Sequence, residues 1–189
     1  ELQQAAEKER QTIYRDLHDD VGSKLLSIVH AGRDNTLGEL ARTALESLRN
    51  AVSRANSQAQ SLGSLLEDIQ EEASLRLEGS GHQLRWQQPQ DIPEAIIPAD
   101  TEFNLNRIFR ELISNIIRHA NASVIGFNFT YSNSVWAFEV LDDGVGLIRS
   151  NTSGNGLGNI KQRIADINGT LEWHPVEPSG TRVTIEVPK

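Results

Sequence analysis

Residues 135–158 read VWAFEVLDDGVGLIRSNTSGNGLG, and this stretch decides the fold. Its first part alternates apolar and polar residues, with Trp136, Phe138 and Val140 on one side, which is the period of a half-buried strand. The strand runs into one glycine-rich segment, and a second one, 154–158, leads into a helical pattern. A strand and a helix joined through two glycine-rich loops predict a domain in which helices cover a sheet.

The same periodicities predict the remaining elements of this domain. We expect helices at 65–77, 101–120 and 157–168, and strands at 84–86, 124–131, 135–141, 171–174 and 182–187. A proline-rich connection, 89–98, separates the first strand from the second helix. The prediction is an α/β sandwich with helices on one face of a mostly antiparallel sheet.

The first 60 residues have a different composition, because all six prolines lie at Pro89 or later and Tyr14 is the only aromatic residue before Trp86. Apolar residues recur there at spacings of three and four, in two runs: Ile13, Leu17, Val21, Leu25 and Ile28, then Leu37, Leu40, Ala44, Leu48, Ala51 and Ala55. These runs predict a helical hairpin, and two hairpins from two copies of the chain would form a four-helix bundle and a homodimer. The alternative is that the hairpin packs on its own second domain.

The predicted fold class is therefore α+β, with a helical hairpin at 1–60 followed by the α/β sandwich at 61–189. The segment Ser61-Leu62-Gly63-Ser64 is predicted to be the hinge between the two domains.

Composition excludes several classes of function. The net charge of −8 and the pI near 5.1 argue against nucleic-acid binding, and the lack of cysteine excludes disulfides and thiolate metal sites. No apolar run reaches the ~18 residues that span a bilayer, and the sequence shows no signal-peptide pattern. The sequence predicts a cytoplasmic fragment, and any membrane contact, such as an inner-membrane anchor, would come from regions outside it.

Polar side chains recur on the helix predicted at 101–120. Glu111, Asn115, Arg118 and His119 follow one another at helical spacing, which is also the pattern of a simple solvated face. Oxygen atoms of Asn115 and Glu111 suit a hard cation such as Mg²⁺, and Arg118 with His119 suits phosphate oxygens.

The loops beyond this helix predict a nucleotide site. Asp142 at a strand end can accept a hydrogen bond from an exocyclic amine such as that of adenine, and Gly144 and Gly146 allow a tight turn. Glycines before a helix N-terminus can cradle phosphate, and Thr181 offers a hydroxyl near the base. The residues of this second loop are Gly154, Gly156, Leu157 and Gly158. The sequence has neither a Rossmann arrangement nor a Walker lysine-serine pair.

A histidine and a carboxylate lie side by side on the first predicted helix, at His18 and Asp19. Together they could serve as a nitrogen nucleophile and its base, although such a pair is most often solvated surface.

The order of these motifs resembles the ATP-binding domain that gyrase, heat-shock chaperone ATPases and sensor histidine kinases share. The segment 15–22, RDLHDDVG, resembles the dimerisation and phosphoacceptor helix of sensor kinases related to the nitrate/nitrite sensors. The resemblance implies that His18 is the phosphoacceptor, Asp19 its base, Asn115 and Glu111 the Mg²⁺ ligands, and Asp142 the residue that binds adenine.

The resemblance also implies a reaction and its partners: autophosphorylation of His18 by ATP, then transfer to an aspartate of a response-regulator receiver domain. Relatives often carry Gln or His five positions after the phosphoacceptor, where Ser23 stands here, so kinase activity is expected more firmly than phosphatase activity. Two alternatives remain: a degenerate kinase that binds nucleotide, dimerises and docks a partner, and a serine kinase with the same ATP pocket.

Overall fold

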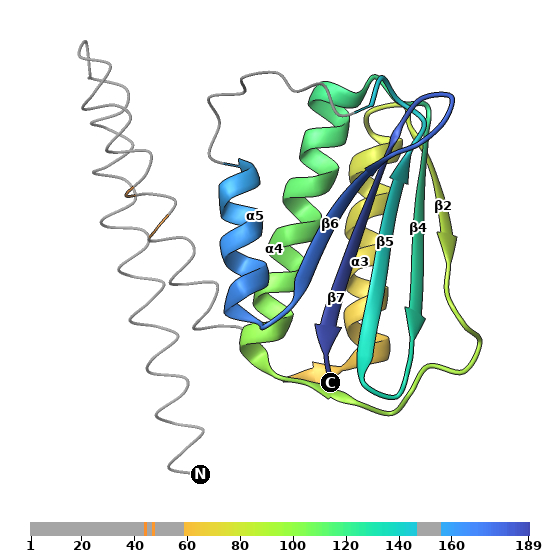
Figure 1. Cartoon of the computed structure of the whole chain (residues 1–189). Helices are drawn as coiled ribbons and strands as arrows, with labels where there is room; N and C mark the ends of the chain where they lie inside the picture. The colour runs from red at the N-terminus through yellow and green to blue at the C-terminus, as the bar shows by residue number, and fades with distance from the viewer. Residues whose placement is uncertain (1–43, 45–46, 48–58, 147–155) are drawn as a thin grey trace, which may run out of the picture. The chain divides into compact units, whose positions relative to one another are not determined.

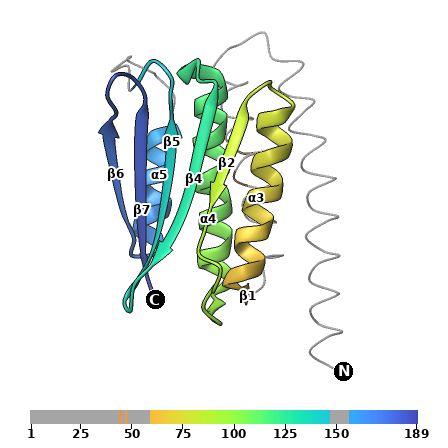
Figure 2. The ribbon, with the colours of Figure 1, turned by 90° about the vertical axis from the view of Figure 1, so that its right-hand side faces the viewer.

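A five-stranded sheet covered on one face by three helices makes up most of what the structure describes (Figures 1 and 2). The computed structural model describes residues 59–146 and 156–189, together with Ala44 and Ser47. Apart from Ala44, Ser47, Ala59 and Gln60, the predicted helical hairpin, with His18 and Asp19, lies outside the described residues, and so does the predicted loop residue Gly154.

The sheet has the strand order β2-β4-β5-β7-β6. Its strands are β2 (Gln83–Gln87), β4 (Val124–Tyr131), β5 (Val135–Asp142), β6 (Thr170–Pro175) and β7 (Thr181–Pro188). Only the β2–β4 pair is parallel, so the prediction of a mostly antiparallel sheet is confirmed. In the register of β5, Asp142 pairs with Ile125 on one side and with Thr181 on the other, which places it in the middle of the sheet at one end.

The helices are α3 (Leu62–Glu78), α4 (Ala99–Asn115) and α5 (Gly156–Asp166), and Figure 2 shows all three behind the same face of the sheet. Their apolar faces meet the alternate residues of the strands, and the fully buried aromatic rings of Phe109, Phe129 and Phe138 lie at the centre. Among the described residues, no helix has both the length and the apolar content that crossing a membrane requires.

The start of α3 differs from the sequence prediction of a hinge at 61–64. The hydroxyl of Ser61 accepts a hydrogen bond from the N–H of Ser64 at 3.1 Å, which caps the helix, and Leu62 is fully buried. β1 (Gln60–Ser61) also pairs with β3 (Ile96–Ile97), directly before α4. The hinge prediction is wrong, because apolar burial and the cap make these residues the first turn of the domain.

The end of α4 also differs from the predicted regular helix. From Ile116 to Ala120 the chain forms a π-helix, η1, and Asn121 then adopts a left-handed conformation with φ of 49°. The sequence pattern does not distinguish this π turn from an α-helix, because Ile116 is buried and Ile117 packs against the core, as they would in an α-helix. Such π turns often occur at functional sites.

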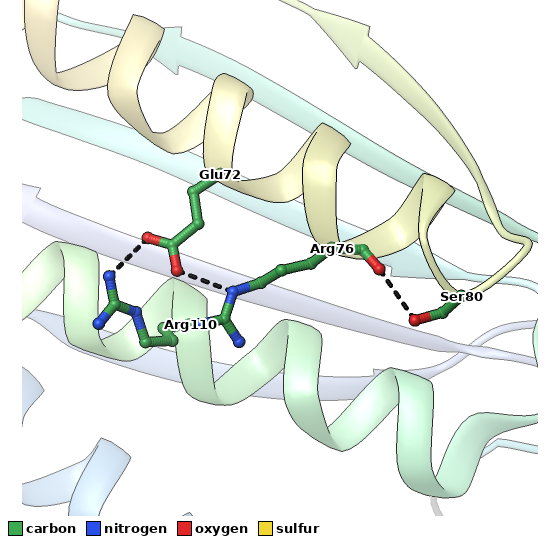
Figure 3. A network of polar contacts seen from close by, with 4 residues as sticks. All are labelled: Glu72, Arg76, Ser80 and Arg110. Atoms are coloured by element: carbon green, nitrogen blue, oxygen red, sulfur yellow. Dashed lines mark hydrogen bonds and ion pairs between the residues drawn. The ribbon is translucent and has the colours of Figure 1, made fainter.

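A charged cluster joins the first two long helices on their solvent side (Figure 3). Glu72 of α3 accepts a hydrogen bond from Arg110 of α4 at 2.7 Å and from Arg76 at 2.8 Å. Burial raises the pKa of Glu72, but the two arginines outweigh that effect, so its pKa lies below the ordinary value.

Candidate functional site

Three connections meet at the upper end of the sheet in Figure 1: the end of α4 with η1, the loop after β5, and the turn before β7. The N-terminus of α5 lies beside α4 at the same end. The predicted site residues that the structure describes all belong to these four segments.

Asp142 is the buried carboxyl of this end, with 5% of its surface exposed. Its Oδ1 accepts the N–H of Gly144 at 2.9 Å, and Thr181 on β7 also donates to it. Burial raises the pKa of Asp142 despite these hydrogen bonds, and the neighbouring charge of Asp143 adds to the rise. A buried carboxyl with an elevated pKa at a sheet end is a strong acceptor for a ligand that brings its own N–H groups.

The backbone of the loop around Asp142 lies in close contact with two neighbouring segments. A Cβ on Gly144 would collide with the carbonyl oxygen of Ala120, and one on Gly180 would collide with the carbonyl oxygen of Asp142. Gly180 has a φ of +123° and Gly146 a φ of +81°, conformations that favour glycine. The predicted role of Gly144 and Gly146 in shaping a tight turn therefore has a direct geometric basis.

The first glycine of α5 lies against the polar side chains of α4. A Cβ on Gly156 would meet Oε1 of Glu111, and it would stand 3.9 Å from Nδ2 of Asn115. The structure thus brings the glycine-rich helix start together with the two residues predicted to bind Mg²⁺. N–H groups of the first turn of α5 and oxygen ligands for a cation therefore lie close together.

The remaining predicted residues of η1 and α5 lie on the solvent side, next to the start of α5. Arg118 and His119 are exposed on η1, and Leu157 is 40% exposed at the start of α5. Among the described residues, no atom lies within 4 Å of a Cβ built on Gly158. The described part of the fold therefore does not need glycine at 158.

The donor set suits an Mg²⁺ ion that is shared with phosphates. In the described part of the chain, no three His, Cys, Asp or Glu side chains gather to hold a metal by themselves. One carboxylate and one amide, Glu111 and Asn115, are the oxygen donors here, and Mg²⁺ typically takes only one or two protein ligands and completes its shell with phosphate and water.

Sequence reasoning missed three contributors to this site. Asp143 accepts two backbone N–H groups, from Ser123 and Val124. Gly180 directly precedes Thr181, and its positive φ and its contact with Asp142 require glycine.

The third contributor that sequence reasoning missed is the polar contact that holds α5 against α4. Asn104 is 1% exposed; its Nδ2 donates to the carbonyl of Asp100 at 2.9 Å, and its Oδ1 accepts from Arg163 of α5 at 3.3 Å. The sequence does indicate that Asn104 is buried, because it lies four positions before Ile108, on the apolar side of the helix.

Comparisons with known proteins relate the chain to ATP-binding domains. Residues 100–189 match the family described as "Histidine kinase-, DNA gyrase B-, and HSP90-like ATPase". The chain is 28% identical to the sensor histidine kinase LiaS of Bacillus subtilis, over 96% of this chain and 54% of LiaS. It is 26% identical to the signal transduction histidine-protein kinase/phosphatase UhpB of Salmonella typhimurium, over 100% of this chain and 40% of UhpB. The chain thus spans about half the length of these relatives or less.

Solved structures show the same fold. Histidine kinase AdeS of Acinetobacter baumannii has a TM-score of 0.56 and 16% identity, covering 90% of this chain and 93% of that one. Full-length ShkA in complex with AMPPNP has a TM-score of 0.62 and 14% identity, covering 96% of this chain and 45% of that one. The predicted α+β fold of this ATPase type is confirmed, whereas the narrower similarity to nitrate/nitrite sensors stays a prediction.

Proposed function

We propose that this chain is the cytoplasmic transmitter core of a sensor histidine kinase of the nitrate/nitrite-sensor-like group. It binds ATP at the upper end of the sheet and transfers the γ-phosphoryl group to His18. The phosphohistidine then donates this group to an aspartate of a response-regulator receiver domain. The similarity to sensor histidine kinases over nearly the whole chain supports this proposal.

One observation carries the proposal: Gly156 lies against Glu111 and Asn115, in the same end of the domain as the buried Asp142. A purine amine at Asp142 and a phosphate chain at the start of α5 would use opposite parts of one site. The five residues of η1 connect the two parts, and its exposed Arg118 and His119 add cationic and hydrogen-bonding groups beside the phosphates.

The chemical step follows from the residue types. A ring nitrogen of neutral His18 attacks the γ-phosphorus, the N–P bond forms, and the bond from that phosphorus to the bridging oxygen breaks, so that ADP leaves with the electron pair. Asp19 accepts the proton of the other ring nitrogen. Mg²⁺, held by Asn115 and Glu111, would neutralise charge on the phosphates.

The partners in this proposal are a second copy of the chain and a receiver domain. The apolar stripes of residues 1–60 would form a four-helix bundle in a homodimer. His18 follows Leu17 of the apolar stripe, so it would lie about 100° around the helix from that stripe, at the rim of the bundle.

The test is incubation of the chain with Mg²⁺ and ATP labelled at the γ-phosphate. We expect label that is acid-labile and base-stable, as phosphohistidine is, and its loss in His18→Gln with nucleotide binding unchanged. His174→Gln is the matched control, because His174 is an exposed histidine on β6 that contacts Glu172, and it should label normally. Nucleotide binding without any label would favour the docking module, and acid-stable label would favour the serine kinase.

A further inference from the structure

Asp143 is an exposed carboxylate that makes two short hydrogen bonds to the backbone. Its Oδ1 accepts the N–H of Ser123 at 2.7 Å and the N–H of Val124 at 3.0 Å. These hydrogen bonds hold the pKa of Asp143 below its ordinary value. The side chain is therefore a fixed acceptor at this end of the sheet, unlike a solvated carboxylate.

The two N–H groups belong to the turn that leads from η1 into β4. Asn121 in this turn is left-handed, and on its other side the carbonyl of Ala120 accepts the N–H of Val145 at 2.8 Å. The loop after β5 is thus bonded to the chain both before and after Asn121. Because η1 is one short π turn, its position depends on where this turn is held.

The same loop also orients the carboxyl of Asp142. The N–H of Gly144, directly after Asp143, donates to Asp142 Oδ1 at 2.9 Å. Gly144 lies so close to the carbonyl of Ala120 that a Cβ would collide with it, and the next residue, Val145, donates its N–H to that carbonyl. The carboxylate of Asp143 therefore connects the base end of the site to the η1 end.

We propose that Asp143 is a positioning residue for nucleotide binding, which acts by holding the η1–β4 turn against the Asp142 loop. This inference rests on the proposed function, because it assigns to Asp143 the alignment of Asp142 with η1 around one nucleotide. Asp143 touches neither base nor phosphate in this role.

The test compares Asp143→Ala with Asp143→Asn in the 189-residue chain. Isothermal titration calorimetry measures the Kd for a non-hydrolysable ATP analogue with Mg²⁺, and NMR measures hydrogen exchange at the Ser123 and Val124 amides. We expect Asp143→Ala to weaken binding about tenfold, because two charge-assisted hydrogen bonds are lost and water replaces them only in part, and to speed exchange at both amides. Asp143→Asn keeps an oxygen acceptor and should stay within about twofold of the parent Kd.

Asp166→Ala is the matched control, since Asp166 is an exposed carboxylate at the far end of α5, and its Kd should not change. The inference is overturned if Asp143→Ala binds as tightly as the parent chain, or if Asn restores nothing. A parent chain that binds no nucleotide would instead overturn the proposed function. In that case the exchange rates still report whether the carboxylate holds the turn.

Discussion

Replacing Gly158 with alanine should separate what the fold needs from what a ligand needs. Gly158 lies in the first turns of α5, and a Cβ there would meet no atom of residues 59–146 or 156–189 within 4 Å. Alanine is better than glycine by ~1 kcal/mol inside a helix, and near a helix start we expect a gain of about 0.5 kcal/mol in the free energy of unfolding. If phosphate occupies this open space, the added methyl group should cost ~1–3 kcal/mol of binding, which corresponds to an increase of about 5- to 150-fold in Kd.

Urea unfolding and titration with a non-hydrolysable ATP analogue measure the two quantities on the same preparation. Gly126→Ala is the matched control, because a Cβ at Gly126 of β4 would make only ordinary contact, 3.5 Å from Cβ of Leu141, and the nucleotide Kd should not change. The reasoning about Gly158 is refuted if its variant is less stable than the parent by more than ~1 kcal/mol. An unchanged Kd would remove Gly158 from the phosphate loop.

Three further predictions concern other parts of the domain. Gly144→Ala should lower the free energy of unfolding by roughly 2 kcal/mol or more in urea titration, because its Cβ would collide with the backbone carbonyl of Ala120, which cannot rotate away. Glu72→Gln should cost about 1 kcal/mol at pH 7, a value reduced for the partial exposure of both arginines, and the difference from the parent should vanish as pH falls through the lowered pKa of Glu72. Nucleotide affinity, measured by calorimetry, should fall on acidification from a higher pH than for an ordinary aspartate, because burial raises the pKa of Asp142.

The pH predictions have internal controls. Glu71→Gln removes an exposed neighbour of Glu72 and should leave the stability profile unchanged, so an equal effect from both variants would contradict the ion-pair argument.

The raised pKa of Asp142 means that the folded domain binds this proton more tightly than the unfolded chain does. Acidification through that range therefore favours folding at this group, so the protonation of Asp142 does not itself unfold the domain. In Asp142→Asn the acid limb of the affinity profile should disappear.

Regular elements of the sheet domain could be predicted because burial on one face leaves a period in the sequence. β5 throughout, and β4 as far as Phe129, carry strict alternation of buried and part-exposed residues, and the predicted limits of both strands are nearly those observed. The sequence did not reveal features in which residues typical of a linker form part of a helix. Ser61 and Gly63 look like a linker by composition, yet the serine hydroxyl caps α3 and the glycine lies within the helix.

The close contacts of the site were also beyond sequence reasoning. A glycine signals freedom of the backbone, but it does not say which atom approaches it. The contact of Gly156 with Glu111 joins residues 45 positions apart, and only the packing of α5 on α4, through Ile160, Ile164 and the Arg163–Asn104 hydrogen bond, brings them together.

The adjacent carboxyls of Asp142 and Asp143 show why identical residues in one motif need a structure to be told apart. Burial raises the pKa of the first, while two backbone N–H groups lower the pKa of the second. Asp142 also accepts hydrogen bonds, from Gly144 and Thr181, but its burial outweighs them, whereas the hydrogen bonds of the exposed Asp143 compensate its charge. A buried carboxyl whose ionised form is poorly compensated gains most from a new donor. This difference favours Asp142 as the group that binds the base, and Asp143 as the group that holds it in place.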